Sequence, residues 1–125
     1  YQIETLFFAI AMGLSSILNP VLKNIFDRER PTLLRLIDIS GFSFPSGHAM
    51  GATSYFGSII YILNRHDSGI SKGVLIGLSA LFILLISTSR VYLGVHYPTD
   101  IIAGIIGGAF CIVLSTLILK KQLAI

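Results

Sequence analysis

The 125-residue sequence is long enough for one domain, but its composition is too apolar for a soluble domain of that size. Hydrophobic residues make up 54% of the chain and charged residues 12%, with a mean hydropathy of +0.83. This composition indicates that lipid covers apolar surface that a small core cannot hide. The net charge of +3 does not indicate nucleic acid as a partner, because the basic residues form no dense run or patch.

Four apolar segments, at residues 3–26, 47–63, 71–89 and 99–119, are predicted to be helices. Within the last segment, residues 101–119 contain no charge. At about 1.5 Å per residue this stretch spans about 28 Å, close to the thickness of the hydrocarbon core of a bilayer. The second segment is shorter and richer in Ser, Thr and Gly than the other three.

These segments predict an all-α fold, a polytopic transmembrane helical bundle with one membrane-embedded domain over residues 1–125. A soluble helical bundle is the alternative, but the third and fourth segments are too uniformly apolar for surface helices. The chain begins with Tyr1 and not with Met. We therefore expect an internal piece of a longer protein that has further helices upstream.

Small residues recur at four-residue spacing, which in lipid lets helix backbones approach closely. The pairs are Gly47 with Gly51, Gly73 with Gly77, and Gly104 with Gly108. We expect them to pack helices within one chain in preference to forming a dimer, so a monomer is favoured. The single cysteine, Cys111, allows no disulfide framework.

The polar motifs are expected to meet at one face of the membrane. If the chain crosses the bilayer back and forth, the connections at 27–44 and 90–98 fall on one side, and the termini and the 64–70 loop on the other. The first side then receives seven polar residues: Lys23, Arg30, Ser46, His48, Arg90, His96 and Asp100.

Three of these residues are cations that would repel each other unless an anion lay between them. A phosphate accepts several such charges, and Arg can bind it through two hydrogen bonds. Ser46 and Gly47 lead into the second helix, whose free N–H groups also favour an anion. We therefore predict a phosphate site made by Lys23, Arg30 and Arg90 with this helix start. The alternative is that the arginines merely lie at the level of the lipid headgroups.

Two histidines and a carboxylate complete the polar set. His96 and Asp100 are four residues apart where the last helix begins, so the carboxylate can hold one ring nitrogen and leave the other with a free lone pair. That is what a nucleophilic histidine requires. His48 begins a different helix and is the candidate general acid.

The remaining polar residues are interpreted as structural. Asp27, Arg28 and Glu29 are expected to form a solvated charged rim, and His66 to be a solvated loop residue. No group of His, Cys, Asp and Glu has the spacing of metal ligands, so we predict neither a metal nor another cofactor.

The three clusters resemble the signature motifs of the type 2 phosphatidic acid phosphatase family. The matching motifs are Lys23-x6-Arg30-Pro31, Pro45-Ser46-Gly47-His48 and Ser89-Arg90-x5-His96-x3-Asp100. Membrane members of this family have six helices with the motifs on the last four, which implies that this chain corresponds to those four. Vanadium haloperoxidases and soluble acid phosphatases share the motifs, but their helices are less uniformly apolar.

The resemblance implies a role for each matching position. His96 would attack phosphorus and form a phosphohistidine, with Asp100 orienting it, and His48 would protonate the leaving oxygen and later activate water. The phosphoryl oxygens would be held by Lys23, Arg30, Ser46, Gly47 and Arg90.

The implied function is hydrolysis of a phosphomonoester or pyrophosphate on a lipid headgroup. A non-catalytic phospholipid-binding or flipping protein is the alternative, although it would not need both histidines. Of the nine Lys and Arg residues, those outside the predicted phosphate site favour the face of the C-terminus. The positive-inside rule then predicts a plasma-membrane protein with its active site on the extracytoplasmic side.

Overall fold

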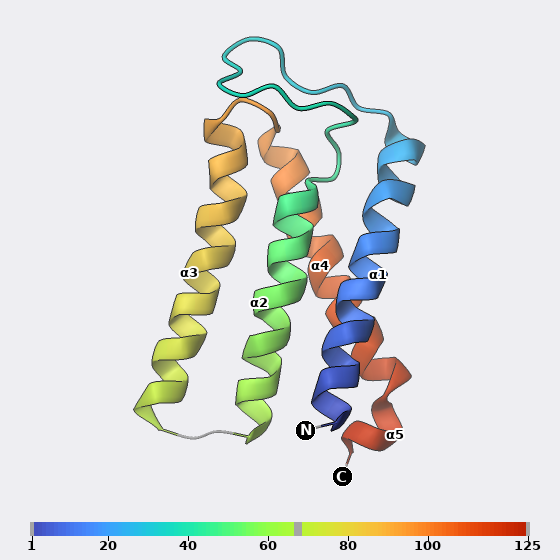
Figure 1. Cartoon of the computed structure of the whole chain (residues 1–125), viewed down its shortest axis with the longest axis vertical. Coiled ribbons are helices and arrows are strands. Elements are labelled where there is room, and N and C mark those ends of the chain that lie inside the picture. The colour runs from blue at the N-terminus through green and yellow to red at the C-terminus, as the bar shows by residue number, and fades with distance from the viewer. Residues whose placement is uncertain (1, 67–68, 125) are drawn as a thin grey trace.

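The computed structural model describes residues 2–66 and 69–124, and these form a bundle of four long helices and one short one (Figure 1). The long helices run in alternating directions. The elements are α1 (Gln2–Phe26), α2 (Gly47–His66), α3 (Ile70–Tyr92), α4 (Pro98–Ile118) and α5 (Lys120–Leu123). The predicted all-α helical bundle is confirmed, and the short α5 was not predicted.

The helix boundaries lie close to the predicted ones. α2 and α3 extend past their predicted ends, because the residues that break each helix come later in the chain. α3 continues three residues past Ser89 because the first residue that favours a break is Gly94, which has a φ of +75°. A Cβ at Gly94 would lie 2.3 Å from the carbonyl oxygen of Leu34, so the close approach of these two connections also requires glycine. α4 begins with Pro98, whose missing N–H costs nothing in the first turn.

Helices α1, α3 and α4 are each long and apolar enough to cross a membrane. α2 is more polar, and it packs against all three of the others. Its Thr53, Ser54 and Ser58 are buried. These three polar side chains therefore face neighbouring helices, which explains why the sequence of α2 is less apolar than that of a lipid-facing helix.

Glycine allows α4 to lie directly against α2. A Cβ at Gly104 would lie 2.8 Å from the carbonyl oxygen of Ser46, and one at Gly108 would lie 2.7 Å from Cβ of Thr53. The predicted packing of this glycine pair within the chain is confirmed. Gly73 and Gly77 have no atom within 4 Å of an added Cβ, so that pair does not pack helices of this chain together.

The two connections that carry the motifs lie at the same end of the bundle, above the ends of α1 and α3 in Figure 1. We call this end, formed by residues 27–46 and 93–97, the motif end. The first turn of α1 and the short α5 lie at the opposite end. There His66 is exposed, as predicted, but it is the last residue of α2 and not a loop residue, and its Nε2 lies 2.5 Å from Oε1 of Glu4.

Candidate active site

The pair formed by His96 and Asp100 lies at the start of α4 and is buried. His96 Nδ1 is 3.2 Å from Asp100 Oδ2, and the exposed fractions of the two residues are 4% and 0%. Tyr97 is the N-cap, and its backbone N–H donates to Asp100 Oδ2 at 2.8 Å. One carboxylate therefore caps the helix and holds the imidazole, because the third residue of a helix can reach back to its N-cap.

Arg30 approaches the other nitrogen of the same ring. Its Nη1 lies 3.0 Å from His96 Nε2, and it also donates to the carbonyl of Val95 at 3.1 Å. A guanidinium can only donate, so Nε2 accepts and carries the lone pair. The ring proton then lies on Nδ1 and points to Asp100. This is the tautomer that a nucleophile at Nε2 requires.

Lys23 ties the last turn of α1 to the segment that precedes α2. Its Nζ donates to the carbonyl oxygens of Phe42 at 2.9 Å and Pro45 at 2.8 Å. Burial lowers the pKa of Arg30, and the positive charges of Arg35 and Arg90 lower it further, while Asp100 acts in the opposite direction. The motif end thus concentrates positive charge, which favours an anion there.

The start of α2 contributes Ser46, Gly47 and His48. Ser46 is fully buried, and its Oγ accepts the N–H of Ala49 at 3.2 Å, as an N-cap does. Its own N–H donates to the carbonyl of Asp100 at 3.0 Å, which joins the start of α2 to the start of α4.

His48 is exposed at the second position of α2. It interacts electrostatically with residues from each of the other motifs, namely Arg90, His96, Arg30 and Lys23. Arg90 lies in the last turn of α3, with its Nε 3.5 Å from Ser89 Oγ. All eight residues that the sequence predicted for the site therefore lie in the motif end or in the helix turns that adjoin it.

Two further residues that were not predicted for the site contact Asp100. Arg28 Nη1 lies 2.7 Å from Oδ1, and the hydroxyl of Ser43 donates to Oδ2. The Arg28 side chain is 39% exposed, so it is partly solvated as predicted. The rim prediction missed its bond to the buried Asp100 and the position of its guanidinium 4.7 Å from the centre of the Phe44 ring. The sequence offers no periodic pattern in this connection that would have separated Arg28 from its charged neighbours.

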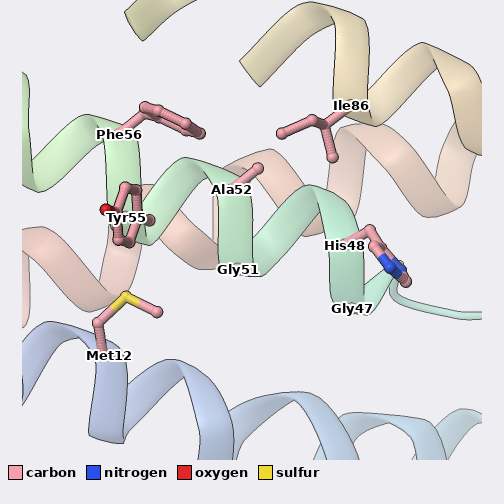
Figure 2. A pocket seen from close by; sticks show the side chains of 8 residues that line it. All are labelled: Met12, Gly47, His48, Gly51, Ala52, Tyr55, Phe56 and Ile86. Carbon is pink, nitrogen blue, oxygen red and sulfur yellow. The ribbon is translucent and has the colours of Figure 1, made fainter. Parts of the chain in front are cut away.

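An apolar pocket of about 520 Å³ adjoins the site, with His48 at one end of it (Figure 2). Side chains of α1, α2 and α3 line it, and Tyr55 and Phe56 lie at the end away from His48. An imidazole at one end and an apolar body therefore share one cavity. Among residues 2–66 and 69–124, no cluster of three or more His, Cys, Asp or Glu side chains could hold a metal ion.

The chain is similar to several known proteins. The family model described as "PAP2 superfamily" matches residues 4–124. Phosphatidylglycerophosphatase B of Bacillus subtilis is 38% identical over 81% of this chain and 51% of its own length. Undecaprenyl-diphosphatase of Sulfolobus acidocaldarius is 34% identical over 86% of this chain and 50% of its own. The chain thus spans about half the length of these curated relatives.

The fold is also similar to that of a solved structure. It is that of a transmembrane PAP2-type phosphatidylglycerolphosphate phosphatase from Bacillus subtilis. The two superpose with a TM-score of 0.81 at 36% identity, over 93% of this chain and 59% of that one.

Proposed function

This chain belongs to the PAP2 superfamily of membrane phosphatases, and we propose that it hydrolyses a lipid phosphate through a phosphohistidine formed on His96. The observation that supports this proposal is the pair of contacts made by the His96 ring. Its Nδ1 faces Asp100, and its Nε2 faces Arg30. Such a ring has its lone pair on Nε2, beside a cation that can hold a phosphoryl oxygen.

The reaction proceeds in two displacements at phosphorus. Nε2 of His96 attacks, the bond to the leaving oxygen breaks, and His48 gives that oxygen its proton. In the second step, His48 takes a proton from water. The water oxygen then attacks the phosphohistidine, which releases inorganic phosphate and restores His96.

The cations stabilise charge on the phosphoryl oxygens during both steps. Arg30 is already beside Nε2, and Arg90 and Lys23 act on the same region from α3 and α1. The hydroxyl of Ser46 and the backbone of Gly47 add the N-terminal end of α2, which favours an anion. Phosphoryl transfer depends mainly on such positioning and charge stabilisation.

The apolar pocket supports a lipid as the substrate, because the chain attached to the phosphate would find apolar walls next to His48. The names of the relatives concern phosphatidylglycerophosphate and undecaprenyl diphosphate. Both carry phosphate on a long apolar group. A lipid monophosphate or diphosphate is therefore the substrate class that we propose, with the motif end on the extracytoplasmic face.

Phosphate release from a panel of lipid phosphates tests the proposal. Purified protein in detergent micelles would be given phosphatidylglycerophosphate, undecaprenyl diphosphate and phosphatidic acid, with and without a chelator. We expect the protein to release phosphate from at least one of these lipids, at a rate that the chelator does not change. Intact cells should also release phosphate when the lipid is added outside, because the site is proposed to face that side. Binding without release from any of the three would favour the non-catalytic alternative, and loss of activity with chelator would contradict a metal-independent mechanism.

The Lys23→Ala variant is expected to lower kcat/KM by about 30- to 1000-fold, which corresponds to about 2–4 kcal/mol for one lost charge-stabilising donor. The measurement is the initial rate of phosphate release over a range of lipid concentrations in mixed micelles. Lys120→Ala removes the same charge at the opposite end of the bundle and serves as the control. An equal kcat/KM for Lys23→Ala and wild type would show that Lys23 does not hold phosphate.

A further inference from the structure

The carboxylate of Asp100 divides its two oxygens between two kinds of partner. Oδ2 accepts from His96 Nδ1 at 3.2 Å and from the N–H of Tyr97. Oδ1 instead faces Arg28, whose Nη1 lies 2.7 Å away. One oxygen therefore holds the imidazole while the other is held by a guanidinium, and a carboxylate fixed at both oxygens cannot rotate away from the ring.

Arg28 is itself held in place by groups from two connections. Its guanidinium carbon lies 4.7 Å from the centre of the Phe44 ring and 5.5 Å from that of Tyr97. The same Nη1 donates to Oγ1 of Thr99 at 2.6 Å. A planar guanidinium that contacts rings and hydrogen-bonds at its edge has few alternative positions.

Because Asp100 is buried, its contact with Arg28 affects the protonation state of His96. Asp100 is fully buried, and a buried carboxylate is costly unless a positive charge is close to it. Without Arg28, the positive charge beside Asp100 would have to come from another partner. The ring of His96 bonds Asp100 and becomes positive when it holds a second proton. An imidazolium has no lone pair and cannot attack phosphorus.

The geometry points to Arg28 as a positioning residue that neutralises Asp100 and so keeps His96 a neutral, correctly oriented nucleophile. Ser43, which donates to Oδ2, supports the same carboxylate. The inference rests on the proposed role of His96. It assigns Arg28 no contact with the phosphate, because its guanidinium lies on the carboxylate side of the imidazole, whereas Arg30 occupies the Nε2 side.

The test compares Arg28→Gln, Arg28→Lys and wild type by kinetics and by ¹⁵N NMR of the histidine rings. For Arg28→Gln we expect kcat to fall about 10- to 100-fold, the size expected for losing a hydrogen bond between charged groups, with KM changed by less than about twofold. Arg28→Lys keeps the charge and should recover most of kcat. In wild type at neutral pH, the His96 ring should give the two widely separated ¹⁵N signals of a neutral Nδ1–H tautomer, and in Arg28→Gln these should move toward imidazolium.

Arg65→Gln is the matched control, because it removes the same side chain from the opposite end of the bundle. Arg65 lies in the last turn of α2, with its guanidinium carbon 5.9 Å from the centre of the Tyr61 ring, so its loss should leave kcat and the His96 spectrum unchanged. The ¹⁵N signals of His96 are identified by their absence from His96→Ala. If Arg28→Gln does not fold, the test rests on Arg28→Lys. Lysine keeps a positive charge beside Asp100, so a loss of kcat in this variant would not come from a carboxylate left without charge compensation.

Two outcomes would overturn the inference. One is an unchanged His96 spectrum in a folded Arg28→Gln, and the other is a change in KM with constant kcat, which would place Arg28 on the phosphate. If wild type releases phosphate from no lipid, the proposed function fails, but the NMR comparison still shows whether Arg28 sets the state of His96.

Discussion

The His96→Ala variant is expected to release lipid phosphate about 10⁴-fold more slowly than wild type, or slower still, because it lacks the nucleophile. Nε2 of this ring faces Arg30 at 3.0 Å, while Nδ1 lies 3.2 Å from the buried carboxylate of Asp100. The measurement is the initial rate of phosphate release from the most reactive lipid of the panel, in the same micelles for both proteins.

Covalent labelling separates the two histidines. With a ³²P-labelled aryl phosphate, whose leaving group needs no proton, His48→Ala should accumulate acid-labile labelled protein, since the water step lacks its base. His96→Ala should take up no label. His66→Ala, a histidine at the opposite end of the bundle, should behave as wild type. Label on the His96→Ala protein would assign the nucleophile to another residue.

The helices could be predicted because apolar runs of membrane length have few alternative structures. Their alternation then placed the motifs at one end without any knowledge of packing, and Figure 1 confirms that arrangement. The contact between His96 and Asp100 followed from four-residue spacing near a helix start, which is a local relation. The sequence therefore predicts contacts within one helix turn and the alternating direction of the helices.

Contacts between connections could not be predicted in the same way. Arg28 and Ser43 reach Asp100 across 72 and 57 residues, and both lie in segments without helical periodicity. The charged run at 27–30 gave no sign of which arginine would face the carboxylate and which the imidazole. The bonds of Lys23 to two carbonyls were missed for the same reason, because the path of the connection determines them.

Glycine positions show where the sequence was ambiguous. Gly73 and Gly77 have the same spacing as Gly104 and Gly108, yet only the second pair lies against a neighbouring helix of this chain. Glycines at this spacing permit two helix backbones to approach closely, but whether they do so depends on the surface of the neighbouring helix.

The Asp100→Asn variant is expected to lower kcat by about 10³- to 10⁴-fold while the protein stays folded, by analogy with the loss of the aspartate that orients a catalytic histidine. The side chain keeps its shape, but one acceptor oxygen becomes an amide that donates. If that amide faces His96 Nδ1, which now lies 3.2 Å from Oδ2, the ring proton moves to Nε2 and the lone pair needed for attack is lost. If it faces the other way, two donors, the amide and Arg28, oppose each other.

Asp38→Asn provides the control, because it removes a carboxylate at the same end of the bundle. The Asp38 side chain is fully exposed and pairs with Arg35 at 3.4 Å. It should keep wild-type kcat. Histidine ¹⁵N spectra of Asp100→Asn should show the proton on Nε2 of His96, which ties the kinetic loss to the tautomer and not to misfolding. A folded Asp100→Asn with near-normal kcat would mean that the attacking nitrogen does not depend on this carboxylate, and Arg30 alone would then have to set the ring.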